Sequence, residues 1–103
     1  MNPDTLRKLE RLAEARIDIV PLIDVTSHFV LAREQWAAFV ERSGDGFGQI
    51  GSAGRLTDRG LAVLVWRQET AYFQGKGWEE QASADDVAQL RAFASDLEQA
   101  LAG

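Results

Sequence analysis

Three glycines in the middle of the chain have the spacing of a phosphate-binding loop. Gly46, Gly48 and Gly51 form the pattern G-x-G-x-x-G, in which backbone N–H groups can approach an anion closely. A dinucleotide fingerprint also requires a strand before the loop and a helix that begins inside it. Gly54 and Gly60 follow instead and argue against such a helix. We therefore expect no dinucleotide binding at this motif.

The segment 43–60 contains six of the nine glycines. Glycine raises the entropic cost of ordering a chain, so the segment is predicted to be a mobile, irregular flap, or a short strand at 47–50 between loops. Thr57-Asp-Arg-Gly60 indicates a turn into the next strand. If the flap closed over a pocket as a lid, His28 or Asp58 would supply the polar group of a ligand site.

Asp24, Ser27 and His28 provide the residue types of a nucleophilic triad. Adjacent strand residues point to opposite faces of a sheet, so Ser27 and His28 are not expected to hydrogen-bond each other. We interpret the three as a turn that leads into the next element, with a half-buried histidine. The chain contains no cysteine and one histidine, which excludes a cysteine nucleophile, a thiolate zinc site and a multi-histidine metal site within one chain. No cofactor or metal is expected.

The net charge of −5 is unevenly placed along the sequence. Residues 79–103 carry six acidic side chains and one arginine, whereas the charges of residues 1–78 cancel. The basic residues near the N-terminus alternate with glutamates, which is typical of a solvated helix face and not of a phosphate-binding surface. The charge therefore favours a basic protein partner over nucleic acid or an anionic membrane. Its candidate contacts are Glu79, Glu80 and Asp96.

Aromatic residues are numerous for a chain of 103 residues, and they include three tryptophans. Most should lie in the core, but tryptophan and tyrosine at a sheet edge are also common anchors of protein interfaces. Tyr72 and Trp78 are expected to share one strand face. Trp78 follows Gly75-Lys-Gly77 and stands beside the acidic segment, so it is a candidate for either the core or an interface, and Tyr72 is a further interface candidate.

Two helices are predicted at the ends of the chain. Residues 4–16 have leucines at helical spacing after Pro3, which suits a first helical turn. Ser83-Ala-Asp-Asp86 resembles a capping box. The apolar stripe that follows it must bury against a sheet or a partner, and consists of Val87, Leu90, Phe93, Ala94, Leu97 and Leu101.

The middle of the chain is predicted to be rich in strands. Residues 17–24 favour an edge strand, or a strand that breaks at Pro21. The segments 28–42 and 61–76 echo each other at an offset of 33 residues, and each is interpreted as a β-hairpin. For residues 28–42 a helix remains an alternative, since their apolar residues also share one helical face and Ser27 could cap it.

These elements predict a single α+β domain over residues 1–103: an N-terminal helix, an antiparallel sheet of four or five strands that includes the two repeated hairpins, and a C-terminal amphipathic helix on one face. The longest apolar run, 61–66, is too short to cross a membrane. The first residues lack an apolar signal region, so a cytoplasmic location is expected. Nine arginines against two lysines indicate a bacterial source.

Two functions follow as hypotheses. The first is a non-catalytic protein-interaction module of chaperone, immunity or adaptor type, acting as a homodimer. The second is a small ligand-binding or catalytic domain in which the glycine-rich segment is the lid of a sheet pocket. A pocket lined by His28 and facing that segment would favour the second, and an aromatic and acidic surface would favour the first.

Overall fold

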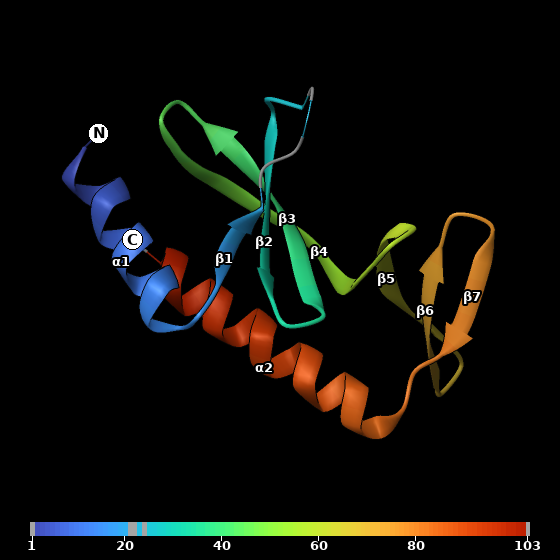
Figure 1. Ribbon diagram of the computed structural model, residues 1–103. Helices are drawn as coiled ribbons and strands as arrows, with labels where there is room; N and C mark the ends of the chain where they lie inside the picture. Colours follow the sequence, from blue (N-terminus) through green and yellow to red (C-terminus); the bar gives the residue numbers. More distant parts are fainter. Residues whose placement is uncertain (1, 21–22, 24, 103) are drawn as a thin grey trace.

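The computed structural model describes residues 2–20, 23 and 25–102. The chain forms a seven-stranded antiparallel sheet whose strands lie in the order of the sequence (Figure 1). One helix precedes the strands in the sequence and the other follows them. The elements are α1 (Pro3–Glu14), β1 (Asp18–Val20), β2 (His28–Arg33), β3 (Trp36–Ser43), β4 (Gly46–Thr57), β5 (Gly60–Arg67), β6 (Thr70–Gly75), β7 (Trp78–Gln81) and α2 (Ala84–Leu101). The α+β class and the two terminal helices are confirmed.

The predicted count of four or five strands was too low. Strand β4 was expected at most as a short strand at 47–50, and strand β7 was not predicted. Strand β1 is an edge strand that ends at Val20, as predicted; Pro21 and Asp24 lie outside the described residues.

Both predicted hairpins are present, and the helix alternative for residues 28–42 was wrong. Strand β2 pairs with β3, and β5 pairs with β6. The first residue of each two-residue turn, Glu34 and Gln68, has a φ near +57°. The two corners are therefore 34 residues apart and not 33, so the hairpins resemble each other in form but not in the proposed alignment. Apolar residues occur on both strand faces, and that is why the segment also resembled a helix.

The predicted flap over residues 43–60 was wrong, because most of it is the twelve-residue strand β4. Ala38, Val40 and Arg42 of β3 pair with Ala53, Ile50 and Phe47 of β4. Between successive pairs the chain advances by two residues in β3 but by three in β4, so β4 contains two bulges. Each of these bulges contains a glycine, as is common where a strand bends. A Cβ at Gly54 would overlap the backbone of Ala62 in β5, so only glycine permits this close approach.

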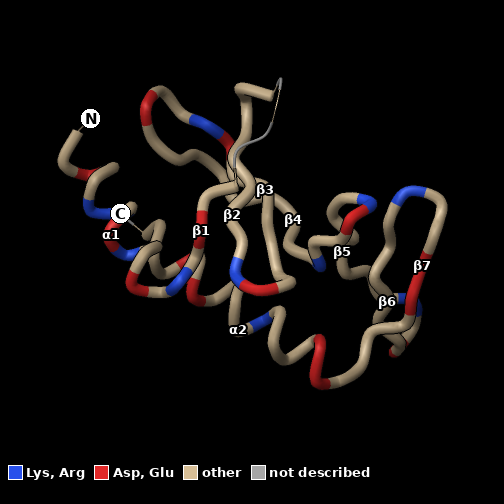
Figure 2. Tube along the Cα trace, viewed as in Figure 1, with Lys and Arg blue, Asp and Glu red and all other residues tan. Residues whose placement is uncertain are grey.

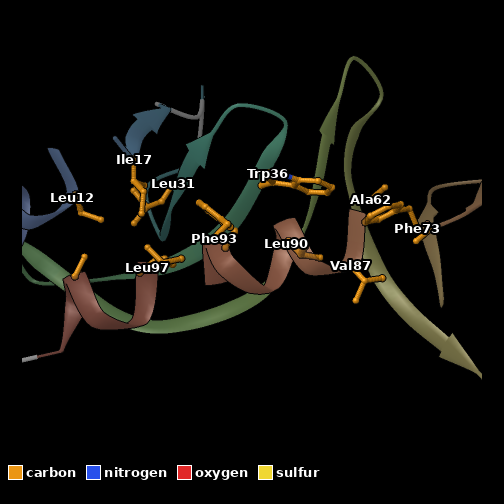
Figure 3. Close-up of a cluster of buried hydrophobic side chains, with 14 of the residues drawn as sticks. Leu12, Ile17, Leu31, Trp36, Ala62, Phe73, Val87, Leu90, Phe93 and Leu97 are labelled. Atoms are coloured by element: carbon orange, nitrogen blue, oxygen red, sulfur yellow. The ribbon is translucent and has the colours of Figure 1, made fainter. Parts of the chain in front are cut away.

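The main core lies between α2 and one face of the sheet (Figure 3). The capping box is present as predicted, with reciprocal hydrogen bonds between Ser83 and Asp86. The stripe of α2 buries Val87, Leu90, Phe93 and Leu97 against strand residues that include Leu31, Trp36, Val40 and Phe73. Helix α1 lies beside the end of α2 (Figure 1), where Arg11 donates a hydrogen bond to the Ala102 carbonyl at 2.6 Å.

The opposite face of the sheet carries a smaller apolar cluster. Val30, Ala32 and Ala37 are buried there, with Val20 and Leu61 packed against them. No described helix covers this face in Figure 1. Within the described ranges, neither helix is long and apolar enough to cross a membrane.

Leu90→Ala or Leu97→Ala should destabilise the protein by about 2–4 kcal/mol, because each change leaves a cavity in the core. Both side chains are almost completely buried, at 4% and 0% exposure. Glu98→Ala, on the exposed face of α2, is the control and should change stability by no more than about 0.5 kcal/mol. Urea unfolding followed by circular dichroism measures all three. Equal midpoints would show that the buried stripe is misplaced.

Candidate functional site

The β4–β5 turn and strand β7 together form a concave surface of about 410 Å³. Its lining residues, which we call the Trp78 pocket, are Thr57, Asp58, Arg59, Trp78, Glu79 and Glu80. Only strand β6 separates β5, where the turn ends, from β7 in the order of the sheet. Neighbouring strands lie about 4.8 Å apart, so long side chains from the turn and from β7 can meet across β6. Figure 2 shows charged residues of both signs at this turn and an acidic stretch on β7.

The turn is held by its own hydrogen bonds. The Thr57 hydroxyl donates to the Gly60 carbonyl at 2.8 Å and accepts from the Arg59 N–H at 3.1 Å. Gly60 has a φ of +103°, a conformation that favours glycine. This turn places the Arg59 guanidinium 5.8 Å from the centre of the Trp78 ring, in the range of a cation–π contact.

Trp78 is the aromatic wall of the pocket and also part of the fold. Its side chain is partly buried and packs against the main core. A Cβ at Gly75, its cross-strand partner, would overlap the indole ring, so the glycine makes room for the tryptophan. Trp78 is therefore a core residue that also reaches the surface, and its role in an interface remains a prediction.

Arg55 lies beneath the pocket and connects it to α2. Its Nη2 atom is 3.0 Å from a carboxylate oxygen of Asp86, and its Nη1 atom is 3.7 Å from one of Glu80. The guanidinium carbon lies 4.4 Å from the centre of the Phe73 ring and 5.6 Å from that of Trp36. Arg55 thus couples an acidic residue of the pocket to the aromatic core and to the start of the helix.

The carboxylates of the pocket differ in their partners. Glu79 is bound by Arg67 at 2.6 Å, and Glu80 has the longer contact with Arg55. Asp58 is exposed and has no basic group within 4 Å in the described part of the chain. The negative charge least compensated by the protein itself therefore lies at Asp58 and Glu80.

Asp96 and Tyr72, two other predicted interface residues, lie outside the Trp78 pocket. Asp96 forms an ion pair of 2.9 Å with Arg33, which also donates to the Ala15 carbonyl at 3.0 Å, so Asp96 joins α2 to the sheet and to the end of α1. Tyr72 pairs with Gln81, whereas Trp78 pairs with Gly75. Because side chains alternate along a strand, Tyr72 and Trp78 lie on opposite faces, and the prediction that they share one was wrong.

His28 and Gly51 line a second concave surface, of about 210 Å³, together with Phe39, Glu41, Gln49 and Ile50. The Ser27 hydroxyl lies 2.8 Å from His28 Nδ1, so the expectation that these two cannot hydrogen-bond was wrong. Ser27 precedes β2, and the alternation of a strand does not apply to it. The other glycines of the motif, Gly46 and Gly48, do not line this surface.

Arg55 and Arg59 were missed in the sequence analysis. The turn signal at Thr57–Gly60 indicated where Arg59 lies, but the contact of that turn with β7 depends on the place of β7 in the sheet, two strands from β5. Across the described residues, no three histidine, cysteine, aspartate or glutamate side chains gather as metal ligands. The chemistry available in the Trp78 pocket is therefore that of carboxylates beside an indole ring, which suits a cationic group.

Comparison with known proteins identified no relative: no family model, no curated protein and no solved structure matches this chain.

Asp86→Asn should destabilise the protein at neutral pH by about 1 kcal/mol, because it removes the charge paired with Arg55 at the helix start. Burial acts to raise the pKa of Asp86, but hydrogen bonds with Ser83 and the Arg55 guanidinium outweigh it and hold the pKa below 3.8. A carboxyl whose pKa is lowered on folding stabilises the protein above its unfolded pKa and loses that contribution as pH falls through the folded value.

The difference between wild type and Asp86→Asn in urea unfolding should thus be constant near neutrality and shrink below about pH 4. Asp85→Asn is the matched control, since it removes the same charge from the same helical turn but has no arginine partner. A difference that persists unchanged into strong acid would contradict the role assigned to the Arg55–Asp86 pair.

Proposed function

We propose that this protein is a non-catalytic protein-interaction module that binds a basic partner through the Trp78 pocket. The observation that supports this most is that one concave surface unites Asp58, Trp78, Glu79 and Glu80, which come from two segments twenty residues apart. A partly buried tryptophan with Glu80 on the same strand face and Asp58 in the same pocket offers both an apolar contact and charge attraction to a lysine or arginine side chain. The net charge of −5 acts in the same direction at longer range.

The internal ion pairs refine which charges would meet the partner. Glu79 and Asp96 are held by Arg67 and Arg33, so they contribute less to association than an unpaired acid would. Asp58 and Glu80 remain the better candidates, and a chaperone, immunity or adaptor role is compatible with such a surface.

The alternative function is a ligand-binding or catalytic domain with His28 as its polar group. The cavity shared by His28 and Gly51, and the hydrogen bond between Ser27 and His28, favour it. Against it, this cavity has about half the volume of the Trp78 pocket, and β4 supplies no flap to close over it. We therefore place it second.

The double change Asp58→Asn, Glu80→Gln should slow association with a basic partner captured from the native host by roughly tenfold at low salt, because charges around an interface mainly set the association rate. The control is Asp45→Asn, Glu98→Gln, which removes the same charge from exposed positions outside the pocket. Surface plasmon resonance with each variant measures the rates. Equal rates for the two double variants would contradict a contact at the Trp78 pocket.

We also propose that the protein forms a homodimer through the sheet face that α2 does not cover. Phe39 and Leu56 are 38% and 36% exposed and share that face with Leu61; uncovered apolar patches of this kind are typical of interfaces. Sedimentation equilibrium at about 100 μM should give twice the monomer mass of 11.4 kDa. Leu56→Glu should shift it to monomer, and a wild-type monomer at that concentration would refute the proposal.

A further inference from the structure

A second groove, of about 390 Å³, lies between α2 and the β5–β6 corner. We call it the Trp66 groove. It is lined by Trp66 of β5, by Arg91 of α2, by small or apolar residues that include Ala71, Ala82, Val87 and Ala88, and by four polar residues that include Glu69. None of these residues belongs to the Trp78 pocket or to the His28 surface.

The groove exists because small side chains leave a core-facing tryptophan uncovered. Trp66 pairs with Ala71, a buried residue of the main core, so its side chain stands on the face that α2 covers. Trp36, on the same face, is 2% exposed, yet Trp66 is 51% exposed. The alanines opposite it are too short to reach the ring, and the apolar surface that they leave matches the wall of a ligand site.

Arg91 adds a positive charge to this apolar surface. Ala84, Val87, Ala88 and Arg91 follow the three- and four-residue spacing of one helix face, and the Arg91 guanidinium lies 5.8 Å from the centre of the Trp66 ring. Arg33, Arg55 and Arg67 each have a carboxylate within 4 Å.

Arg91 has no such partner among the residues that the structure describes, although Glu69 lines the same groove. A guanidinium that lies beside an aromatic ring can still bind a carboxylate through two parallel hydrogen bonds. Glu69 has no basic group within 4 Å among the described residues either, so the groove holds one unpaired anion beside one unpaired cation, and Arg91 is the cation that a carboxylate could meet.

We propose that the Trp66 groove binds a small apolar group that carries one carboxylate, with the apolar group against Trp66 and the alanines that line the groove and the carboxylate on Arg91. The volume lies in the range of small-ligand pockets, roughly 300–1,000 Å³. The net charge of −5 opposes a multiply charged anion such as a phosphate, so a single carboxylate is the best match. A free organic acid and the C-terminal residue of a peptide both supply this chemistry.

The test uses the full chain labelled with ¹⁵N and follows the indole N–H resonance of Trp66, assigned with a Trp66→Phe variant. N-acetyl-phenylalanine is the probe, and its amide, which lacks the charge, is the control ligand. We expect a saturable shift with the acid and at least roughly tenfold weaker binding of the amide. No saturable shift up to about 10 mM acid, or equal affinity for acid and amide, would overturn the proposal.

Arg91→Gln should weaken binding of the acid by roughly tenfold or more. Arg42→Gln is the matched control, because Arg42 is also an exposed arginine over an aromatic ring, 4.6 Å from the centre of Phe29, and does not line the groove, and it should leave the affinity unchanged. Wild-type affinity in Arg91→Gln would also overturn the proposal. Acetyl-Gly-Gly-Phe with a free C-terminus separates the two sources: tighter binding than the single residue identifies a peptide terminus, and equal or weaker binding identifies a small acid.

Discussion

The contacts of the Arg55 guanidinium hold three parts of this protein in place: the aromatic core, strand β7 and the start of helix α2. One planar cation lies over Phe73 in the core, pairs with Asp86 at the start of α2 and reaches Glu80 on β7. Arginine suits this position because it is more weakly hydrated than lysine and can stack and hydrogen-bond at once. Asp86 also accepts from the Ser83 N–H, so the cap of the helix and its attachment to the sheet share one carboxylate.

The glycines of β4 allow this strand to bend and to lie close to β5. Two bulges bend the strand where it pairs with β3, and Gly54 lets the backbone of β5 approach closely. Beyond Gly54, the β4–β5 turn lies near β7, with Arg59 over Trp78. The segment that looked like a mobile cover for a site is thus the ordered strand that shapes one, since a glycine-rich run can indicate either a flexible loop or a strongly bent strand.

Features that depend on residues close together in the sequence could be predicted, whereas contacts between distant segments of the chain could not. The capping box of Ser83 and Asp86 and the two hairpins depend on residues a few positions apart, and each was found. The contact of Arg55 with Asp86 joins residues thirty-one positions apart, and nothing local distinguishes Arg55 from other arginines. Of the candidate site, the residue types at Asp58, Trp78, Glu79 and Glu80 were recognised, but their meeting was not, because it depends on strand β7, which was not predicted, and on its place two strands from β5.

The same pairing changes how the charge of the chain should be understood. The acidic excess of residues 79–103 is an asymmetry along the sequence, but four of its six acids meet arginines of the sheet. Arginine is thus used in two ways. Where α2 and β7 must be held, it pairs with carboxylates; at Arg59 and Arg91 it lies over a partly exposed tryptophan at the wall of a cavity. A solvated cation–π contact is worth only about 0.5–1 kcal/mol, so these two cavities are where an incoming group could replace an internal contact at little cost to the fold.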